Sequence, residues 1–146
     1  MADPLFKQYK KKIIQELGRK ALDDLQINNL GKELIGTKWK GVFAQDKLPN
    51  TTGFMVVNTD TSKKINSDSS HWVGIYQTAK TMFIYDSFGR TTKYVLQLIY
   101  AKTKKKIVES KHDAEQHGAN SEICGQLALG WLCVANDLGI RQALKI

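Results

Sequence analysis

The chain is poor in the residues that cross-link or break up a small protein. Its 146 residues include two cysteines and two prolines. Cys124 and Cys133 fall within one predicted helix, and a rise of about 1.5 Å per residue places them too far apart to bond to each other. A disulfide-based fold is therefore excluded, and reduced thiols are the expected state.

The sequence also lacks long apolar runs. No segment approaches the roughly 20 apolar residues that a membrane span needs. The first residues, Met1 to Lys7, have no apolar core of the signal-peptide type. We therefore expect no membrane partner, and a protein that is intracellular or packaged inside something made in the cell.

What is present is typical of one globular domain over residues 1–146, with 42% hydrophobic and 25% charged residues. Residues 1–26 form a basic segment that we expect to be helical. The formal net charge is +8. Lysines cluster at 7–12, 38–40, 63–64 and 102–106. Such runs are either solvated surface or a surface for non-specific binding of DNA, because no sequence-reading motif accompanies them.

Hydrophobic spacing predicts the order of elements. We expect helix over 5–25, broken at Gly18; loop with short turns over 27–36; strands at 42–43, 54–59, 71–76, 82–87 and 106–109; a helix over 91–101; and a last helix from residue 123 or 124 to about 138, stopped by Gly139. This order indicates an α+β fold, or a mixed three-layer fold.

The strands at 71–76 and 82–87 are joined by a short polar link, which predicts a hairpin. Its geometry places His71, at the start of one strand, near Asp86, at the end of the other. A carboxylate in that position can hold one tautomer of the imidazole and leave the other ring nitrogen free. The pair therefore predicts a general base and its orienting acid.

Cys124 lies where a polar loop meets an apolar helix. A thiol in the first helical turn faces the positive end of the helix dipole, which favours the thiolate. The backbone N–H groups there can stabilise an oxyanion, and Gly125 leaves space for an incoming carbonyl. Cys133, in the middle of the helix, is interpreted as core packing. Cys124 is the predicted nucleophile, with His71 as its base.

A metal site is the alternative interpretation of the same region. His112, Asp113, Glu115 and His117 precede Cys124 and offer nitrogen, oxygen and sulfur donors. Their spacing matches no zinc motif, so we expect neither a metal nor another cofactor for the chemistry.

The order of these residues resembles the adenovirus endopeptidase (adenain) family, in the superfamily that includes deSUMOylating proteases. The matching segments run in order along the chain: 34–37, 41–43, 46–47, 54–59, His71-Trp72, Asp86 to Gly89, and Gly118 to Gly125. The resemblance implies a papain-like or adenain-like fold, a central mixed sheet flanked by helices with the nucleophile at a helix N-terminus. It also implies a maturation protease that cuts viral precursor proteins at small, Gly-containing sites, in the host nucleus or cytoplasm and in the virion.

By the same resemblance, a Gln side chain and the Cys124 N–H form the oxyanion hole. Gln116 is the candidate, although the alignment places His117 at that position. Asp86 stands where adenain usually has Glu. DNA is an expected activator. The cysteine that tethers adenain's peptide activator has no counterpart beside Cys124 and Cys133, so we expect no such peptide.

Two other functions fit the same residues. A deubiquitinating or deSUMOylating protease would use the same triad on a folded modifier. A basic DNA-binding module on a dormant protease scaffold would keep the charge and lose the chemistry, but the intact His71, Asp86 and Cys124 argue against it.

Overall fold

The computed structural model describes residues 2–63, 71–110 and 122–146. The helices are α1 (Ala2–Leu17), α2 (Asp24–Ile35), α3 (Thr92–Val95), α4 (Gln97–Lys102), α5 (Cys124–Leu138) and α6 (Ile140–Ala143), with short 3-10 turns η1 (Gly36–Lys38) and η2 (Gln45–Lys47). The strands are β1 (Trp39–Ala44), β2 (Gly53–Asn58), β3 (Trp72–Gln77), β4 (Thr81–Tyr85) and β5 (Lys106–Glu109).

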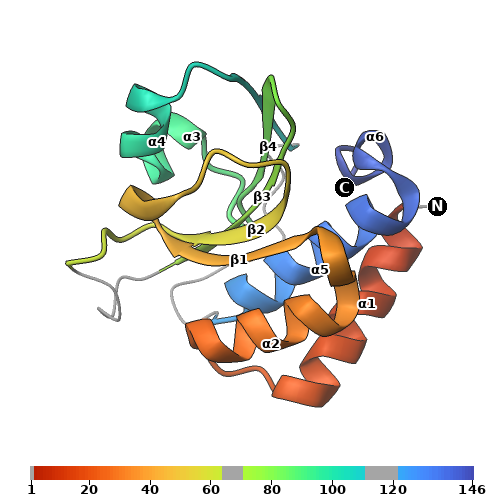
Figure 1. The fold of residues 1–146 in the computed structure, drawn as a ribbon. Helices are drawn as coiled ribbons and strands as arrows, with labels where there is room; N and C mark the ends of the chain where they lie inside the picture. Colours follow the sequence, from red (N-terminus) through yellow and green to blue (C-terminus); the bar gives the residue numbers. More distant parts are fainter. Residues whose placement is uncertain (1, 64–70, 111–121) are drawn as a thin grey trace.

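The five strands form one sheet in chain order, β1-β2-β3-β4-β5, with β3 at its centre. The central pairs β2–β3 and β3–β4 are antiparallel, whereas the outer pairs β1–β2 and β4–β5 are parallel. Helices flank this mixed sheet (Figure 1). The α+β expectation is confirmed at this level.

Alternate residues of each strand serve two separate cores. In β2, Phe54 and Val56 face a core shared with α1, α2 and α5. Met55 and Val57 face a smaller core closed by α3 and α4. Every residue of β2 is buried, since both faces of the strand are covered. The helices therefore lie on the two faces of the sheet, α1, α2 and α5 below it and α3 and α4 above it (Figure 1).

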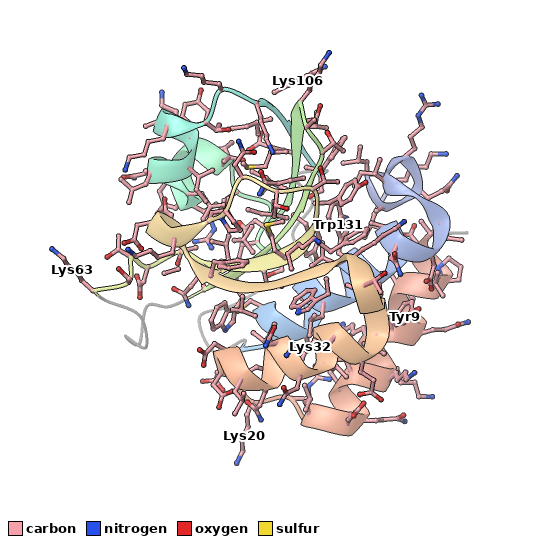
Figure 2. The ribbon with its side chains drawn as sticks, viewed as in Figure 1. Tyr9, Lys20, Lys32, Lys63, Lys106 and Trp131 are labelled. Atoms are coloured by element: carbon pink, nitrogen blue, oxygen red, sulfur yellow. The ribbon has the colours of Figure 1, made fainter. Side chains whose placement is uncertain are left out.

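Helix α5 is the centre of the larger core. Its first twelve residues, 124–135, are all buried. Trp131 stacks on Tyr85 of β4 with ring centroids 5.4 Å apart, and it lies deep between the layers (Figure 2). Phe6 of α1 meets the same Tyr85 ring edge-on at 6.2 Å. The N-terminal segment is thus part of the core that holds α5 in place.

Several predicted elements are confirmed. The hairpin β3–β4 is antiparallel, as expected. The last helix begins at Cys124 and ends at Leu138, and Gly139 follows it with a φ of 92° that favours glycine. Strand β5 has the predicted bounds. No helix within the described ranges is long and apolar enough to cross a membrane.

The expectation of a loop over residues 27–36 is wrong, because α2 occupies most of it. Asp23 begins this helix with a capping box, in which its side chain accepts from the Gln26 backbone and Gln26 bonds back. A glycine at position 31 favours a loop in the sequence. In the structure it lies inside α2, where a Cβ would be 2.4 Å from the Trp39 ring. The glycine lets α2 pack closely on β1.

The expected helix over 91–101 is broken at Leu96, which has φ −129° and ψ 58°. Leu96 is fully buried in the smaller core. The Leu98 N–H, at the start of α4, donates to the Gln45 side-chain oxygen at 2.7 Å. A partner from another element thus replaces the helical hydrogen bond. Tyr94, in the first of the two short helices, is 65% exposed.

Candidate active site

His71 immediately precedes β3 and Asp86 immediately follows β4, so the hairpin brings both to the same edge of the sheet. The His71 Nε2 is hydrogen-bonded to Asp86 Oδ1. Both residues are buried, at 7% and 3% exposure. The Thr59 N–H donates to the His71 carbonyl at 2.9 Å and fixes the backbone beside the ring.

Arg90 holds the second carboxylate oxygen of Asp86. Its backbone N–H and its Nε each donate to Asp86 Oδ2 at 3.0 Å. The turn between them is closed by the Gly89 N–H, which donates to the Asp86 carbonyl at 2.8 Å. Each carboxylate oxygen of Asp86 therefore has its own donor, which fixes the plane of the group.

These contacts determine the charge of Asp86. Burial by itself would raise its pKa, but the hydrogen bonds and charges of His71 and Arg90 outweigh burial and lower the pKa from 3.8 to about 2. Asp86 is therefore ionised at neutral pH, as an acceptor that orients an imidazole must be.

The third member of the group comes from the far end of the chain. Cys124 is the first residue of α5 and is 8% exposed. Its side chain lies close enough to His71 to raise the pKa of the imidazole. Because Nε2 of the imidazole is bonded to Asp86, Nδ1 is the nitrogen left for Cys124. The structure thus brings together three of the four predicted site residues.

The imidazole is affected by opposing influences. Burial lowers the pKa of His71, but its hydrogen bond to Asp86 and the nearby Cys124 side chain raise it, and the net direction is upward. A histidine with a raised pKa more readily keeps a proton taken from a thiol.

Gly125 also has a packing role, beside the space that it is predicted to leave for a carbonyl. A Cβ at this position would lie 3.1 Å from Ile27 Cδ1 and 3.3 Å from Trp72 Cδ1. The glycine therefore allows close packing of α5 against α2 and the start of β3. Trp72 is itself held by its indole N–H, which donates to the Leu22 carbonyl at 3.0 Å. The packing sets the position of Cys124 relative to His71.

The two cysteines differ strongly in their surroundings. Cys133 is fully buried in the core. Burial, with the nearby Asp137 charge, raises the pKa of its thiol from 9.0 to about 12. Cys133 therefore stays a neutral thiol at physiological pH. Both cysteines are free.

The sequence analysis assigned no role at the site to Arg90, Phe88 or Tyr94. The Phe88 ring lies 5.3 Å from the imidazole of His71. The Arg90 guanidinium stacks over Phe88 at 4.9 Å and near Tyr94 at 5.7 Å. The spacing of Asp86 and Arg90 could have suggested their contact, because a basic residue four positions after an acid can reach back to the carboxylate.

Gln116 and its alternative His117 lie outside the described residues, as do His112, Asp113 and Glu115. The oxyanion role of Gln116 or His117 therefore stays a prediction, and the alternative of a metal site is not tested. Within the described ranges, no group of three or more His, Cys, Asp or Glu side chains is arranged to hold a metal ion.

Comparison with known proteins adds no family to this geometry. A scan against protein-family models finds no match, and a search of the curated proteins finds none similar to the chain. The functional argument therefore depends on the site.

Proposed function

We propose that the chain is a cysteine peptidase with Cys124 as nucleophile, His71 as general base and Asp86 as the orienting acid. The observation that carries this proposal is one buried imidazole that is hydrogen-bonded to Asp86 and has Cys124 close enough to raise its pKa. A nucleophile, a base and an acid linked in series are what acyl transfer through a thiol requires.

The reaction would proceed in two halves. The Cys124 thiol gives its proton to His71, and the sulfur attacks the carbonyl carbon of the scissile peptide bond. The C–N bond then breaks, His71 returns the proton to the leaving amine, and a thioester remains on Cys124. Water, deprotonated by His71, hydrolyses that thioester and restores the thiol.

The negative oxygen formed in each half needs donors. The first N–H groups of α5 have no carbonyl four residues earlier in the helix, so they are free to point at an anion. The Cys124 N–H is the nearest of these to the sulfur. We expect Gln116 to supply the second donor, with His117 as the alternative.

The resemblance to adenain extends the proposal to fold type and biology. A mixed sheet with the cysteine at a helix N-terminus, and a histidine and an acid on neighbouring strands, is compatible with a papain-like or adenain-like protease. We infer a maturation protease that cuts viral precursor proteins, acts in the infected cell and the virion, and uses DNA as an activator.

Labelling with a peptide electrophile tests the nucleophile. A peptide vinyl sulfone ending in Gly-Gly should modify the native chain once, at Cys124, and Cys124→Ala should abolish both labelling and cleavage of the matching fluorogenic peptide. Cys133→Ala is the matched control, because it removes the other thiol from the same helix and should leave labelling intact.

The outcomes separate the candidates. Labelling that survives Cys124→Ala would contradict the proposed nucleophile. Fluorogenic ubiquitin and SUMO substrates should be poor; efficient turnover of either would replace the maturation protease with a modifier-removing one. Absence of both labelling and cleavage in the folded native chain would favour the dormant scaffold.

A further inference from the structure

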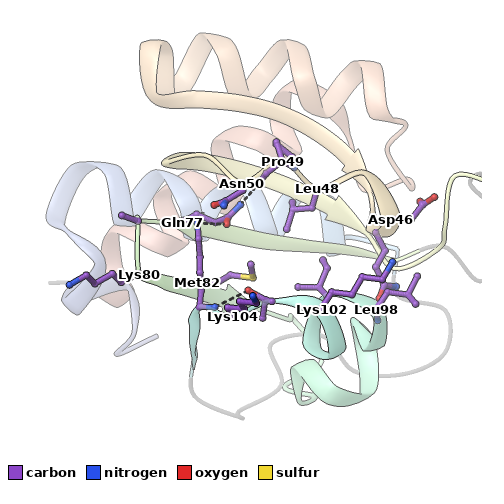
Figure 3. Close-up of a pocket in the computed structure, with 15 residues that line it drawn as sticks. Asp46, Leu48, Pro49, Asn50, Gln77, Lys80, Met82, Leu98, Lys102 and Lys104 are labelled. Carbon is purple, nitrogen blue, oxygen red and sulfur yellow. Dashed lines mark hydrogen bonds between the residues drawn. The ribbon is translucent and has the colours of Figure 1, made fainter.

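A cavity of about 590 Å³ lies well away from the candidate active site. It is bounded by the segment after η2, the β3–β4 turn and the end of α4 (Figure 3). His71 and Asp86 lie at one end of the β3–β4 hairpin, whereas this cavity includes Gln77 and Lys80 at the other end. Its volume is within the range of small-molecule sites, roughly 300–1,000 Å³.

The lining combines an apolar surface with several cations. Leu48, Met82, Leu98 and Ile99 provide the apolar part. The cations are Lys80, Lys102, Lys104 and Lys105. Lys80 extends outward at the left of the view, whereas Lys102 and Lys104 lie nearer its centre (Figure 3).

These lysines are not neutralised by the protein. Among the described residues, no carboxylate lies within ion-pair distance of any of the four. Asp46 also lines the cavity, but its carboxylate accepts hydrogen bonds from the Ser62 backbone N–H at 2.6 Å and the Ser62 hydroxyl at 2.7 Å. These hydrogen bonds come from neutral groups and leave Asp46 negatively charged, so the lining has four cations against one anion and a net positive charge.

Gln77 and Lys105 give the cavity a fixed polar wall. The Gln77 residue is 1% exposed, and its amide nitrogen donates to the Pro49 carbonyl at 2.9 Å. Its amide oxygen accepts from Lys105 Nζ at 2.8 Å. Burial lowers the pKa of Lys105, and the partner of its ammonium is the neutral Gln77 amide rather than a carboxylate. A ligand anion would give that ammonium a charged partner.

We propose that this cavity binds a small anion with an apolar body, an alkyl or aryl group that carries a phosphate or a carboxylate. The body would cover Leu48, Met82 and Leu98, and the anionic head would lie against Lys105 and the neighbouring lysines. An inorganic anion would leave the apolar surface wet, and an uncharged alkyl group would leave the lysines unpaired. The site does not depend on the proposed protease activity.

Titration followed by ¹⁵N NMR tests the site with four probes: octyl phosphate, octanoate, inorganic phosphate and octyl glucoside, each below its micelle concentration. We expect octyl phosphate or octanoate to shift the Gln77 side-chain amide and the backbone signals of Leu98 and Lys105. Inorganic phosphate and octyl glucoside should bind at least about tenfold more weakly, since each offers one half of the recognition. Whichever of the two anionic amphiphiles binds more tightly identifies the head group.

Lys105→Met keeps the length of the side chain and removes its charge, and should weaken binding about tenfold. Lys32→Met, on α2 outside the cavity, is the matched control and should leave binding unchanged. Equal affinity in both variants, shifts confined to other residues, or octyl glucoside binding as tightly as octyl phosphate would each overturn the proposal. So would a DNA duplex that shifts these signals when neither amphiphile does.

Discussion

At the scale of single residues, the candidate site depends on one carboxylate with two different partners. Asp86 gives one oxygen to His71 and the other to Arg90. Orientation of the imidazole and ionisation of the acid therefore have the same structural cause. The two can be tested separately, the ionisation of Asp86 through stability and the orientation of the imidazole through kinetics.

Asp86 should make the protein less stable in acid. Its pKa is lowered from 3.8 to about 2 in the folded chain, so its ionised form contributes stability that is present above pH 4 and is lost as the pH falls toward 2. The contribution is about 2 kcal/mol. Urea unfolding between pH 6 and pH 2 should show the difference between the native chain and Asp86→Asn shrinking by that amount.

Asp24→Asn, on the exposed surface of α2, is the control for this measurement. It should change the unfolding free energy by less than about 0.5 kcal/mol across the same pH range. If the difference between the native chain and Asp86→Asn were the same at pH 6 and pH 2, the ionised pair would not contribute as described.

Arg90 should act as a positioning residue. Arg90→Met removes the Nε donor and the stacked guanidinium, while the backbone N–H still holds Asp86. We expect kcat on the Gly-Gly peptide to fall about threefold to tenfold with KM little changed, because the base is misaligned and substrate contacts are intact. Arg90→Lys keeps the charge but not the planar fork, and should recover only part of the rate. A loss confined to KM would instead indicate that Arg90 contacts the substrate.

At the scale of elements, α2 packs closely against β1. Gly31 meets the Trp39 indole, whose N–H donates to the Asn28 side chain at 2.8 Å. This contact joins a helix to the edge of the sheet. A side chain added at Gly31 would meet this rigid ring rather than the flexible end of another side chain.

Gly31→Ala should therefore destabilise the protein by about 1–3 kcal/mol, despite the better helix propensity of alanine. The cause is the clash of the new Cβ with the Trp39 ring, 2.4 Å away. Asn29→Ala, exposed on the same helix, should be neutral or slightly stabilising. Chemical unfolding of both variants distinguishes a packing effect from a general effect on α2; equal stabilities would contradict the packing account.

The same elements show how far sequence reasoning reaches. The hairpin and α5 were predictable because alternation and helical spacing are local signals, and they placed His71, Asp86 and Cys124 near one another. Helix α2 was missed because Gly31 was interpreted as a loop residue. The glycine is needed instead for close packing against Trp39, which is distant in the sequence. The break at Leu96 depends on Gln45, and the role of Arg90 depends on the turn after Asp86. The contacts of Trp39 and Gln45 are long-range and have no local pattern, whereas the four-residue spacing of Asp86 and Arg90 is a local signal that the prediction did not use.

At the scale of the whole molecule, the positive charge is spread over several faces. Lys20, Lys63 and Lys106 project from three different sides (Figure 2). The net charge of +8 favours contact with a polyanion from many orientations rather than through one groove. Binding of this kind would be weak, sequence-independent and highly sensitive to salt.

We therefore expect duplex DNA to bind with an affinity that falls about 100-fold between roughly 50 and 200 mM salt, equivalent to about four phosphate contacts. At the lower salt concentration DNA should raise the rate of peptide cleavage. Fluorescence anisotropy and the fluorogenic peptide measure the two effects on one preparation. A cleavage rate that stays flat when DNA is added at low salt would exclude DNA as an activator.

The packing of α1 against α5 also sets when the site can exist. His71 and Asp86 are synthesised well before α5, which carries both Cys124 and the centre of the larger core. A nascent chain still lacking residues 124–138 has no Cys124, and α1 lacks the helix that it packs against. The grouping of His71, Asp86 and Cys124 can therefore form only after α5 has been synthesised.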